Sequence, residues 1–431
     1  MIKVNLTQKI RIFPNPEQEE VLKVLSEKCR LIYNFALEER ITAWKNDIKG
    51  INYFKQNKDL PKIKDRFSEY KWVYSKVLQE VLRNLDASYK SFFALWKKGN
   101  KDARPPKFKG KKYFTTMVYN QSGFKIEKGF IKFSHNYNKV PLFFEIPERF
   151  QIENVKQVSI SQDNLNKEYY VSICYEIADR QYIDNGKYQA IDLGITNIVT
   201  AVNMKGKFIQ IKNRRPDKYW LKKIEELQSR RDRCKRFSNR WYKYNNQLKH
   251  MIRKCSNQIK DFQHKLSKKI VEHTKSNTII VGELEVKQMA RKRKGKANRK
   301  SRRSLNRAIK NTGTLGRFVQ FLTYKAERVG KRTIRISERN TSKMCCICGK
   351  IHNLSLSDRE MNCDCGNEID RDKNSCVNMM KRFLSQNAKW TGYQEFLGNL
   401  RHTVNDKTRV PSPNFEYGSE NSQEAHEFIR G

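Results

Sequence analysis

The densest group of reactive side chains is a set of five cysteines between Cys345 and Cys365. They fall in two knuckles, CCICG and CDCG, that a short polar loop separates. Four thiolates at this spacing suit a closed tetrahedral Zn²⁺ site, which is structural because no coordination position stays open for a substrate. We predict four ligands: Cys345, Cys348, Cys363 and Cys365.

Three features leave alternatives open at this zinc site. Cys346 is the spare thiol, since Cys345 and Cys348 give the usual two-residue gap, whereas one residue separates the second pair. His352 is an alternative ligand, although a surface loop histidine is the more ordinary interpretation. The other five cysteines are isolated and the chain starts with an alternating MIKVNLTQKIRIF instead of an export signal, so metal is favoured over disulfides.

Carboxylates form the second candidate group. Asp192 lies within the apolar segment AIDLG, where burial is costly unless the carboxylate is paired or binds a metal. The alternative is an aspartate that caps a turn at the strand end. Asp370 and Asp372 follow the second knuckle and open a helical segment, so one of them is expected to cap the helix and the other is free to bind a cation.

The elements that carry these acids follow a recognisable order. Three strand patterns occur first, at 188–195, 197–203 and 206–212, with a turn at Met204–Gly206. They are followed by a long helical pair, the apolar strand 277–284, the helix 315–330, the strand 333–337 and a last helix from about Lys373. In the second helix of the pair, apolar residues recur as in a coiled-coil seam: Leu248, Ile252, Cys255, Ile259, Phe262, Leu266 and Ile270.

Three strands, helix, strand, helix, strand, helix is the order of an RNase H-like α/β domain with a mixed sheet. A nuclease of this fold needs two or three carboxylates that converge on two Mg²⁺ ions. Asp192 supplies one of them and the Asp370–Asp372 pair another. The third acid is expected on the fourth strand or on its neighbour.

The N-terminal residues 1–184 read as a helical insert carried on a β module. Alternating segments at 123–133, 141–146, 155–162 and 169–177 predict one small antiparallel sheet. At the other end, residues 402–431 are rich in Asn, Ser, Pro and Glu, a composition typical of disorder.

The charge balance predicts the partner. The chain carries 89 Lys and Arg against 45 Asp and Glu, a net charge of +44. Such an excess favours nucleic acid, because each phosphate that it neutralises releases counterions. A membrane surface could also attract this charge, but no apolar run approaches ~18 residues, so we expect no membrane partner. The cationic stretch 291–303 and the helical pair, whose aromatics include Trp220, Trp241, Tyr242 and Tyr244, are the candidate phosphate-gripping surfaces.

Several segments resemble one family. FPNPEQ…CRLIYNFAL, AIDLGITNIVTA, HKLS at 264–267, VGELEVKQMA and TSKMCCICG…CDCGNEIDRDKNS are similar to the TnpB (OrfB) proteins of insertion sequences, relatives of type V CRISPR effectors and of eukaryotic Fanzor proteins. The resemblance implies cleavage of double-stranded DNA, guided by an RNA from the element's end. It also implies a RuvC (RNase H-like) domain with an inserted zinc finger, and a wedge β module with a helical recognition lobe that reads a short flanking motif.

The resemblance implies boundaries and roles. The wedge and recognition lobe take 1–184, the nuclease 185–340 and 368–401, the zinc finger 341–367 and the tail 402–431. Asp192 is implied as the first catalytic aspartate and Asp372, in the D-x-N spacing to Asn374, as the last. Two rival functions stay open: a nuclease-dead RNA-guided repressor of DNA and a transposase. The expected location is a prokaryotic cytoplasm, at the nucleoid.

The third acid departs from the family pattern. Gly282 stands where most relatives carry glutamate, and Glu283 comes one residue late, which turns a strand side chain to the other face. Some relatives have a relocated glutamate before the TSK segment, and Glu338 stands there. Gly282 leaves room for a carboxylate that reaches across from the next strand. We favour Glu338 over Glu283, with a surface acid beside the zinc finger as the alternative for Glu338.

Overall fold

The computed structural model describes residues 3–46, 51–120, 122–148, 150, 154–163, 165–178, 180–283, 315–354, 358–387 and 390–405. The chain divides into two compact units, residues 1–178 and 179–431. The division falls six residues before the boundary that the sequence predicted. Each unit has its own hydrophobic core.

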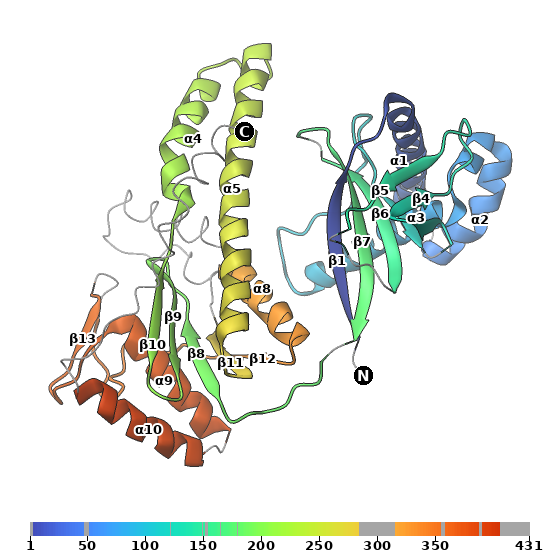
Figure 1. Cartoon of the computed structure of the whole chain (residues 1–431). Helices are drawn as coiled ribbons and strands as arrows, with labels where there is room; N and C mark the ends of the chain where they lie inside the picture. Colours follow the sequence, from blue (N-terminus) through green and yellow to red (C-terminus); the bar gives the residue numbers. More distant parts are fainter. Residues whose placement is uncertain are drawn as a thin grey trace. The chain divides into compact units, whose positions relative to one another are not determined.

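The first unit combines helices with two antiparallel sheets (Figure 1). Its helical elements are α1 (Pro16–Lys45), α2 (Tyr53–Arg66), the 3₁₀ helix η1 (Ser68–Trp72) and α3 (Ser75–Lys97). One sheet has the order β1-β7-β6-β2, from strands β1 (Lys3–Ile12), β2 (Met117–Asn120), β6 (Val155–Gln162) and β7 (Tyr169–Ala178). The other has the order β3-β4-β5, from Phe124–Glu127, Phe130–Phe133 and Leu142–Glu145.

The single sheet predicted for the N-terminal unit was therefore wrong. The segments at 123–133 and 141–146 pair only with one another within the described residues. The segments at 155–162 and 169–177 instead pair with the first strand and with β2, which no alternation had signalled. Alternation predicts a strand but does not choose its partner, because pairing is decided by contacts distant in sequence.

The second unit is built on a five-stranded mixed sheet with the order β10-β9-β8-β11-β12. Its strands are β8 (Tyr188–Asp192), β9 (Asn197–Asn203), β10 (Phe208–Lys212), β11 (Thr278–Gly282) and β12 (Arg332–Ile336). The first three form an antiparallel meander, and β8, β11 and β12 run parallel. β11 is buried throughout, as its apolar sequence predicted for a central strand.

Helices cover both faces of this sheet (Figure 1). The helices are α4 (Pro216–Asp232), α5 (Asn239–His273), α8 (Leu315–Arg328), α9 (Arg371–Gln386) and α10 (Trp390–Asn405), and a small hairpin of β13 (Glu360–Asn362) and β14 (Glu368–Asp370) precedes α9. Side chains of α9 and α10 pack with Ala190 and Ile280 on one face. Side chains of α5 and α8 pack with Ile191 and Val281 on the other. Strand parity thus decides which helical layer each residue faces.

Three further expectations need correction. Asp192 is the last residue of β8, not a residue of its middle. Ile252, placed in the seam of α5, is exposed to 45%, whereas Leu248, Cys255, Phe262 and Leu266 are buried. The helix α10 continues to Asn405, past the predicted start of the tail at 402; residues 406–431 lie outside the described part.

None of the described helices is both long and apolar enough to span a bilayer.

Candidate active site and metal centre

Asp192 lies level with Gly282 at the carboxyl ends of two neighbouring parallel strands. Ile191 of β8 pairs with Val281 of β11, so the next residues, Asp192 and Gly282, are neighbours across the sheet. Laterally paired residues point to the same face, here the one that α9 covers, because Asp192 shares the parity of Ala190. The carboxylate of Asp192 therefore points toward the N-terminal end of α9.

Glu338 fills the space above Gly282. It follows β12, whose Ile336 is the register partner of Gly282. A Cβ built on Gly282 would lie 1.7 Å from Oε1 of Glu338, so the carboxyl group occupies the place of the missing side chain. The Oε1 atom is buried and has no hydrogen-bond partner among the described residues. Burial raises the pKa of Glu338 to about 7.

Asp370 and Asp372 divide the roles that the sequence analysis expected for them. Asp370 is the N-cap of α9: its Oδ1 accepts hydrogen bonds from the backbone N–H groups of Asp372 and Lys373, both at 3.0 Å. The carboxyl group of Asp372, in the first turn, is left to face the sheet. Its Oδ2 accepts from Nδ2 of Asn197 at 3.4 Å and lies 4.0 Å from a Cβ built on Gly194.

The charges of Glu338 and Asp372 both act on Asp192. The pKa of Asp192 is raised well above its usual value, first by burial and then by the negative charges of Glu338 and Asp372. The pKa of Asp372 is raised by burial and by Asp370. Cys376, one turn along α9, is buried beside the same group, and burial and the charge of Asp192 raise the pKa of its thiol. Carboxyl groups that resist ionisation together form a site that a cation would stabilise.

Glu283 does not join this group. Its backbone N–H donates to the carbonyl of Ile336 at 2.7 Å, so it extends the pairing of β11 with β12. Its parity is that of Val281, which faces the opposite layer, and the residue is exposed. Asp192 thus lies near enough to Glu338 and to Asp372 for their charges to raise its pKa, whereas Glu283 lies apart.

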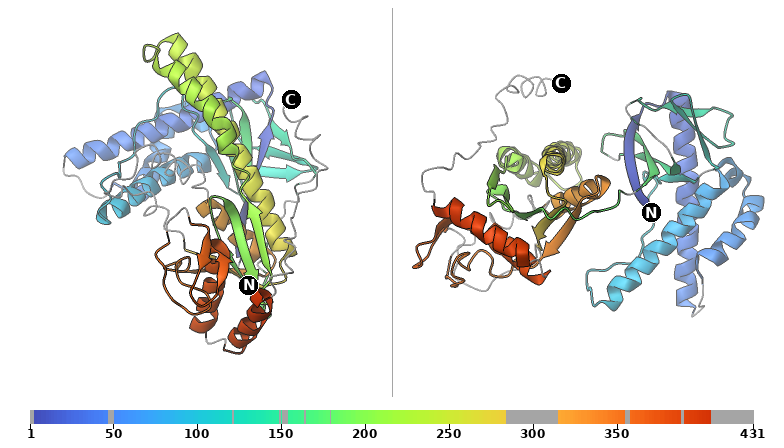
Figure 2. Two further views of the ribbon diagram at one scale, coloured as in Figure 1. Left: turned by 90° about the vertical axis from the view of Figure 1, so that its left-hand side faces the viewer. Right: turned by 60° about the horizontal axis from the view of Figure 1, so that its bottom comes forward.

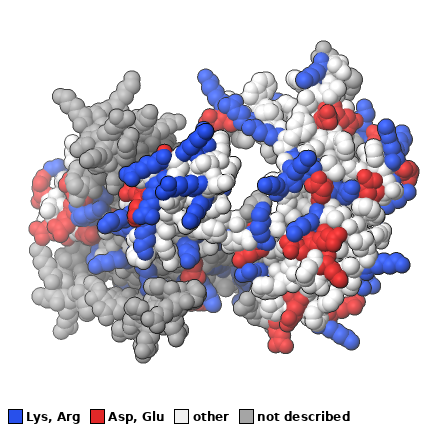
Figure 3. Space-filling model, turned by 90° about the horizontal axis from the view of Figure 1, so that it is seen from above, with Lys and Arg blue, Asp and Glu red and all other residues white. Residues whose placement is uncertain are grey.

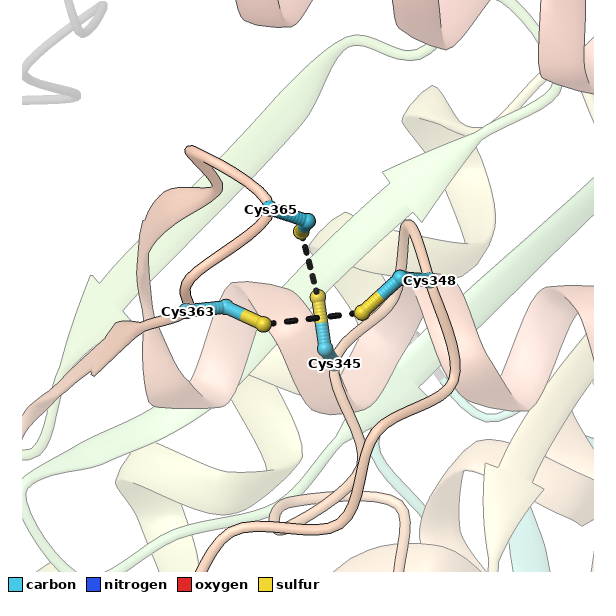
Figure 4. Close-up of side chains that lie close together, drawn as sticks. All are labelled: Cys345, Cys348, Cys363 and Cys365. Atoms are coloured by element: carbon cyan, nitrogen blue, oxygen red, sulfur yellow. Dashed lines mark hydrogen bonds between the residues drawn. The ribbon is translucent and has the colours of Figure 1, made fainter.

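The four cysteines predicted as ligands meet at one point (Figure 4). The Sγ atoms of Cys345 and Cys365 are 3.7 Å apart and those of Cys348 and Cys363 are 3.5 Å apart. All four ligand atoms lie within 4.8 Å of one another. Four converging sulfurs, two from buried cysteines (Cys345 and Cys363) and two from exposed ones (Cys348 and Cys365), fit one tetrahedral Zn²⁺ ion.

Two residues near this cluster have other roles. Cys346 is buried and lies outside the group of four converging sulfurs, so it suits the spare thiol. Nε2 of His352 lies 3.2 Å from the sulfur of Cys363, so this histidine contacts a predicted ligand instead of replacing it.

Asn374 and Asn378 of α9 hold the first cysteine knuckle, CCICG, and the residues just before it. Asn374 is fully buried; its Oδ1 accepts from the backbone N–H of Cys346 at 2.9 Å and its Nδ2 donates to the carbonyl of Met344 at 2.8 Å. The Nδ2 of Asn378, one turn later, donates to the carbonyls of Thr341 and Met344. Sequence reasoning assigned these contacts to neither residue. The sequence feature that could have indicated these contacts is a pair of asparagines four residues apart on the buried face of an amphipathic helix.

The predicted nucleic-acid surfaces are only partly described. The cationic stretch 291–303 lies outside the described residues. The helical pair is the long α4–α5 hairpin, which both views of Figure 2 show as two helices side by side. Among its aromatics, Trp220 donates from Nε1 to Oε1 of Gln258 on the facing helix at 2.7 Å. Tyr242 is exposed.

The chain is similar to known proteins in sequence and in fold. Family descriptions match in order: "Helix-turn-helix domain" over residues 1–49, "Probable transposase" of the OrfB_IS605 type over 172–293, and "Cas12f1-like, TNB domain" over 316–379. Despite the first description, the described part of residues 1–49 is one strand, β1, followed by one long helix, α1.

Relatives and solved structures agree with these matches. A Streptomyces pristinaespiralis protein named "Putative RNA-guided DNA endonuclease" is 27% identical over 393 residues, 90% of this chain and 92% of that protein. The TnpB-like protein L79 of Acanthamoeba polyphaga mimivirus is 33% identical over 145 residues, 33% of this chain and 26% of that protein. A solved Cas12f1–sgRNA–target DNA complex matches with a TM-score of 0.56 at 13% identity, covering 88% of this chain and 98% of that one.

The fold is thus that of the Cas12 effector proteins. The match spans almost the whole of that structure, and the family matches include both the segment with Asp192 and the segment with the cysteine knuckle and Asp372. By these matches the chain is similar to the TnpB (OrfB) proteins over most of its length.

Proposed function

We propose that this protein is an RNA-guided DNA endonuclease of the TnpB type. The observation that carries the proposal is the carboxyl group of Glu338, which fills the space above Gly282 and whose charge, with that of Asp372, raises the pKa of Asp192. Gly282 alone would suggest a lost catalytic acid and a nuclease-dead repressor. A carboxylate from the adjacent strand in that same space favours a retained nuclease.

The proposed catalytic domain is RNase H-like, of the RuvC type. Its support is the sheet itself: an antiparallel meander followed by two parallel strands, with helices between them and after them. The acids stand at the carboxyl ends of parallel strands and at a helix N-terminus, which are the positions where α/β folds hold their ligands. The N-terminal unit would serve as the wedge and recognition lobe.

The three carboxyl groups suit two Mg²⁺ ions. All the donors are oxygens, the ligand type that Mg²⁺ prefers, and the buried Oε1 of Glu338 has no other described partner. When bound, such ions activate water and stabilise the leaving oxygen of a phosphodiester. Asp192, Glu338 and Asp372 would hold them as ionised carboxylates, so Glu338 must release any proton that its raised pKa retains near neutral pH.

Zinc would have no part in the chemistry. Four cysteine sulfurs close its coordination sphere, and the knuckle rests on Asn374 and Asn378 of the helix that also carries Asp372. The ion would therefore fix the position of α9 by holding the knuckle that packs against it.

Guide RNA and double-stranded DNA are the proposed partners. The net charge of +44 supports a polyanionic ligand. The Streptomyces relative is named for RNA-guided action on DNA, and the matched Cas12f1 structure contains sgRNA and target DNA. In such complexes base pairing to the guide reads the target while the protein reads a short flanking motif.

The test is plasmid cleavage. The protein is purified with the RNA encoded beside its gene and incubated with Mg²⁺ and plasmids carrying a matched target behind a library of flanking motifs. The proposal predicts cutting that depends on RNA, target and Mg²⁺. Binding to the matched target without cutting would favour the repressor, and strand joining of transposon ends without RNA would favour the transposase.

A further inference from the structure

The tip of the α4–α5 hairpin carries a cluster of aromatic rings that the proposed active site does not use. Phe237 lies in the connection between the helices, and its ring centroid is 5.5 Å from that of Trp241 and 6.3 Å from that of Tyr242. The rings of Trp241 and Tyr242 are 5.3 Å apart, and the guanidinium of Arg236 lies 4.9 Å from the ring centre of Phe237. We call the rings of Phe237, Trp241 and Tyr242 the tip cluster.

The tip cluster is exposed and partly strained. Phe237 is 59% exposed and Tyr242 48% exposed. Phe237 also adopts φ +67°, the left-handed region that is unfavourable for a bulky side chain. Strain of this kind persists where the surrounding structure imposes it and is often found at functional positions.

Helix capping explains only part of this arrangement. Ser238 caps α5, with its Oγ accepting from the backbone N–H of Trp241 at 3.2 Å. Phe237 and Tyr242 therefore occupy the positions of a hydrophobic staple. A staple does not require an aromatic ring in a left-handed conformation, and it would not leave both members about half exposed.

The positive charge around the tip of the hairpin favours a polyanion as ligand. From Arg230 to Lys254 the sequence has ten Lys or Arg residues and one acid, Asp232. Figure 3 shows these cationic side chains gathered over the α4–α5 hairpin. Exposed rings among cations fit a nucleic acid whose base faces are open, since bases stack on aromatic side chains and cations neutralise the phosphates. A continuous duplex offers no open base face along its length.

We infer that the tip cluster is a stacking platform for unpaired bases of RNA. This inference rests on the proposed function, in which RNA is the constant partner and offers loops and single-stranded ends, whereas the target DNA is paired until it is opened. Phe237 and Tyr242 supply the exposed faces, and Arg236 lies beside the first of them.

The decisive variant is F237G. Glycine adopts the left-handed region without steric cost, so the F237G substitution removes the ring without adding backbone strain. Y242Q removes the second exposed ring, F237W restores a stacking surface, and I252A is the matched control, since Ile252 is an exposed apolar side chain of the same helix. Purified full-length proteins are titrated with a 20-nucleotide oligo(U), the corresponding oligo(dT) and a 20-base-pair RNA duplex in 0.5 M salt, which weakens contacts to phosphate alone.

The expected result is a loss of about tenfold in affinity for oligo(U) in F237G and Y242Q, the order expected for one stacked base. Wild-type affinity is expected in F237W and I252A, with unchanged duplex binding and an unchanged unfolding midpoint in F237G. Ultraviolet crosslinking of 4-thiouridine oligo(U) to the wild type should map to residues 237–242. Equal oligo(U) binding by F237G and wild type overturns the inference, and a loss of affinity in F237G that is confined to oligo(dT) overturns its assignment to RNA. No step requires DNA cleavage, so the inference and the proposed function can fail separately.

Discussion

The carboxyl group of Glu338 stands where a side chain at position 282 would stand. Gly282 and Ile336 are register partners on β11 and β12, and a Cβ on Gly282 would lie 1.7 Å from Oε1 of Glu338. A carboxylate at this place can therefore come either from a side chain at position 282 or from Glu338. The two cannot occupy it together, because their atoms would overlap.

This relationship predicts the effect of G282A. The added methyl must displace the Glu338 carboxyl group, so we expect DNA cleavage to fall by roughly 100-fold or more while RNA binding stays intact. E338A should be equally impaired. The double variant G282E/E338A, which moves the acid to β11, should recover part of the activity. Cleavage rates of the three variants on one plasmid target check this, and full activity of G282A would contradict it.

The alternative third acid has its own test. Glu283 is exposed on the other side of the strand, so E283Q should cut at the wild-type rate, whereas D192N, E338Q and D372N should not cut. Guide RNA retained on purification serves as the folding control for all four variants. An inactive E283Q beside an active E338Q would reverse the assignment.

The raised pKa of Glu338 predicts a pH dependence of stability without metal. Between about pH 5 and 7 the folded carboxyl keeps a proton that the unfolded chain gives up, so rising pH favours unfolding. A shift from 4.5 to about 7 corresponds to on the order of 3 kcal/mol. Denaturant titrations in EDTA should show stability falling across this window in the wild type and falling less in E338Q. Mg²⁺ should offset the loss, because it binds the ionised form; a flat wild-type profile in EDTA would count against a buried, unpaired carboxyl.

The cysteine knuckle predicts one zinc ion per chain. C348S and C365S should lose the metal, measured by elemental analysis of purified protein, whereas C346A should keep it because Cys346 is the spare thiol. Loss of zinc from C346A would show that the ligand set is wrong.

The buried amide of Asn374 predicts that knuckle and catalytic helix are coupled. N374A leaves the buried N–H of Cys346 without its partner, whereas the carbonyl of Met344 keeps its hydrogen bond from Asn378, so the cost is roughly 1–3 kcal/mol. We expect a lower unfolding midpoint, zinc lost at lower chelator concentrations and slower cleavage. Since N374A retains all four cysteines, unchanged zinc retention in a destabilised variant would argue against coupling.

The sequence predicted those parts of the fold and site that depend on local pattern. The buried run of β11 indicated a central strand, and the paired acids of 370–372 indicated one cap and one free carboxylate. Strand parity separated Glu338 from Glu283, because alternation is a property of the backbone.

What the sequence did not predict depends on long-range contacts. Nothing in residues 123–146 indicated that these segments form a separate sheet from 155–177. Asn374 and Asn378 carry no local sign that their partners are the backbone of the knuckle about thirty residues earlier. Such partners are decided by tertiary packing, which periodicity does not encode.

The most direct test of the central claim is a crystal or cryo-EM structure with Mn²⁺ in place of Mg²⁺. We predict metal density between Asp192, Glu338 and Asp372, with carboxylate oxygens at roughly 2.0–2.3 Å from the ions. Metal held by Glu283, or density that touches Asp192 and Asp372 separately and never together with Glu338, would contradict the account.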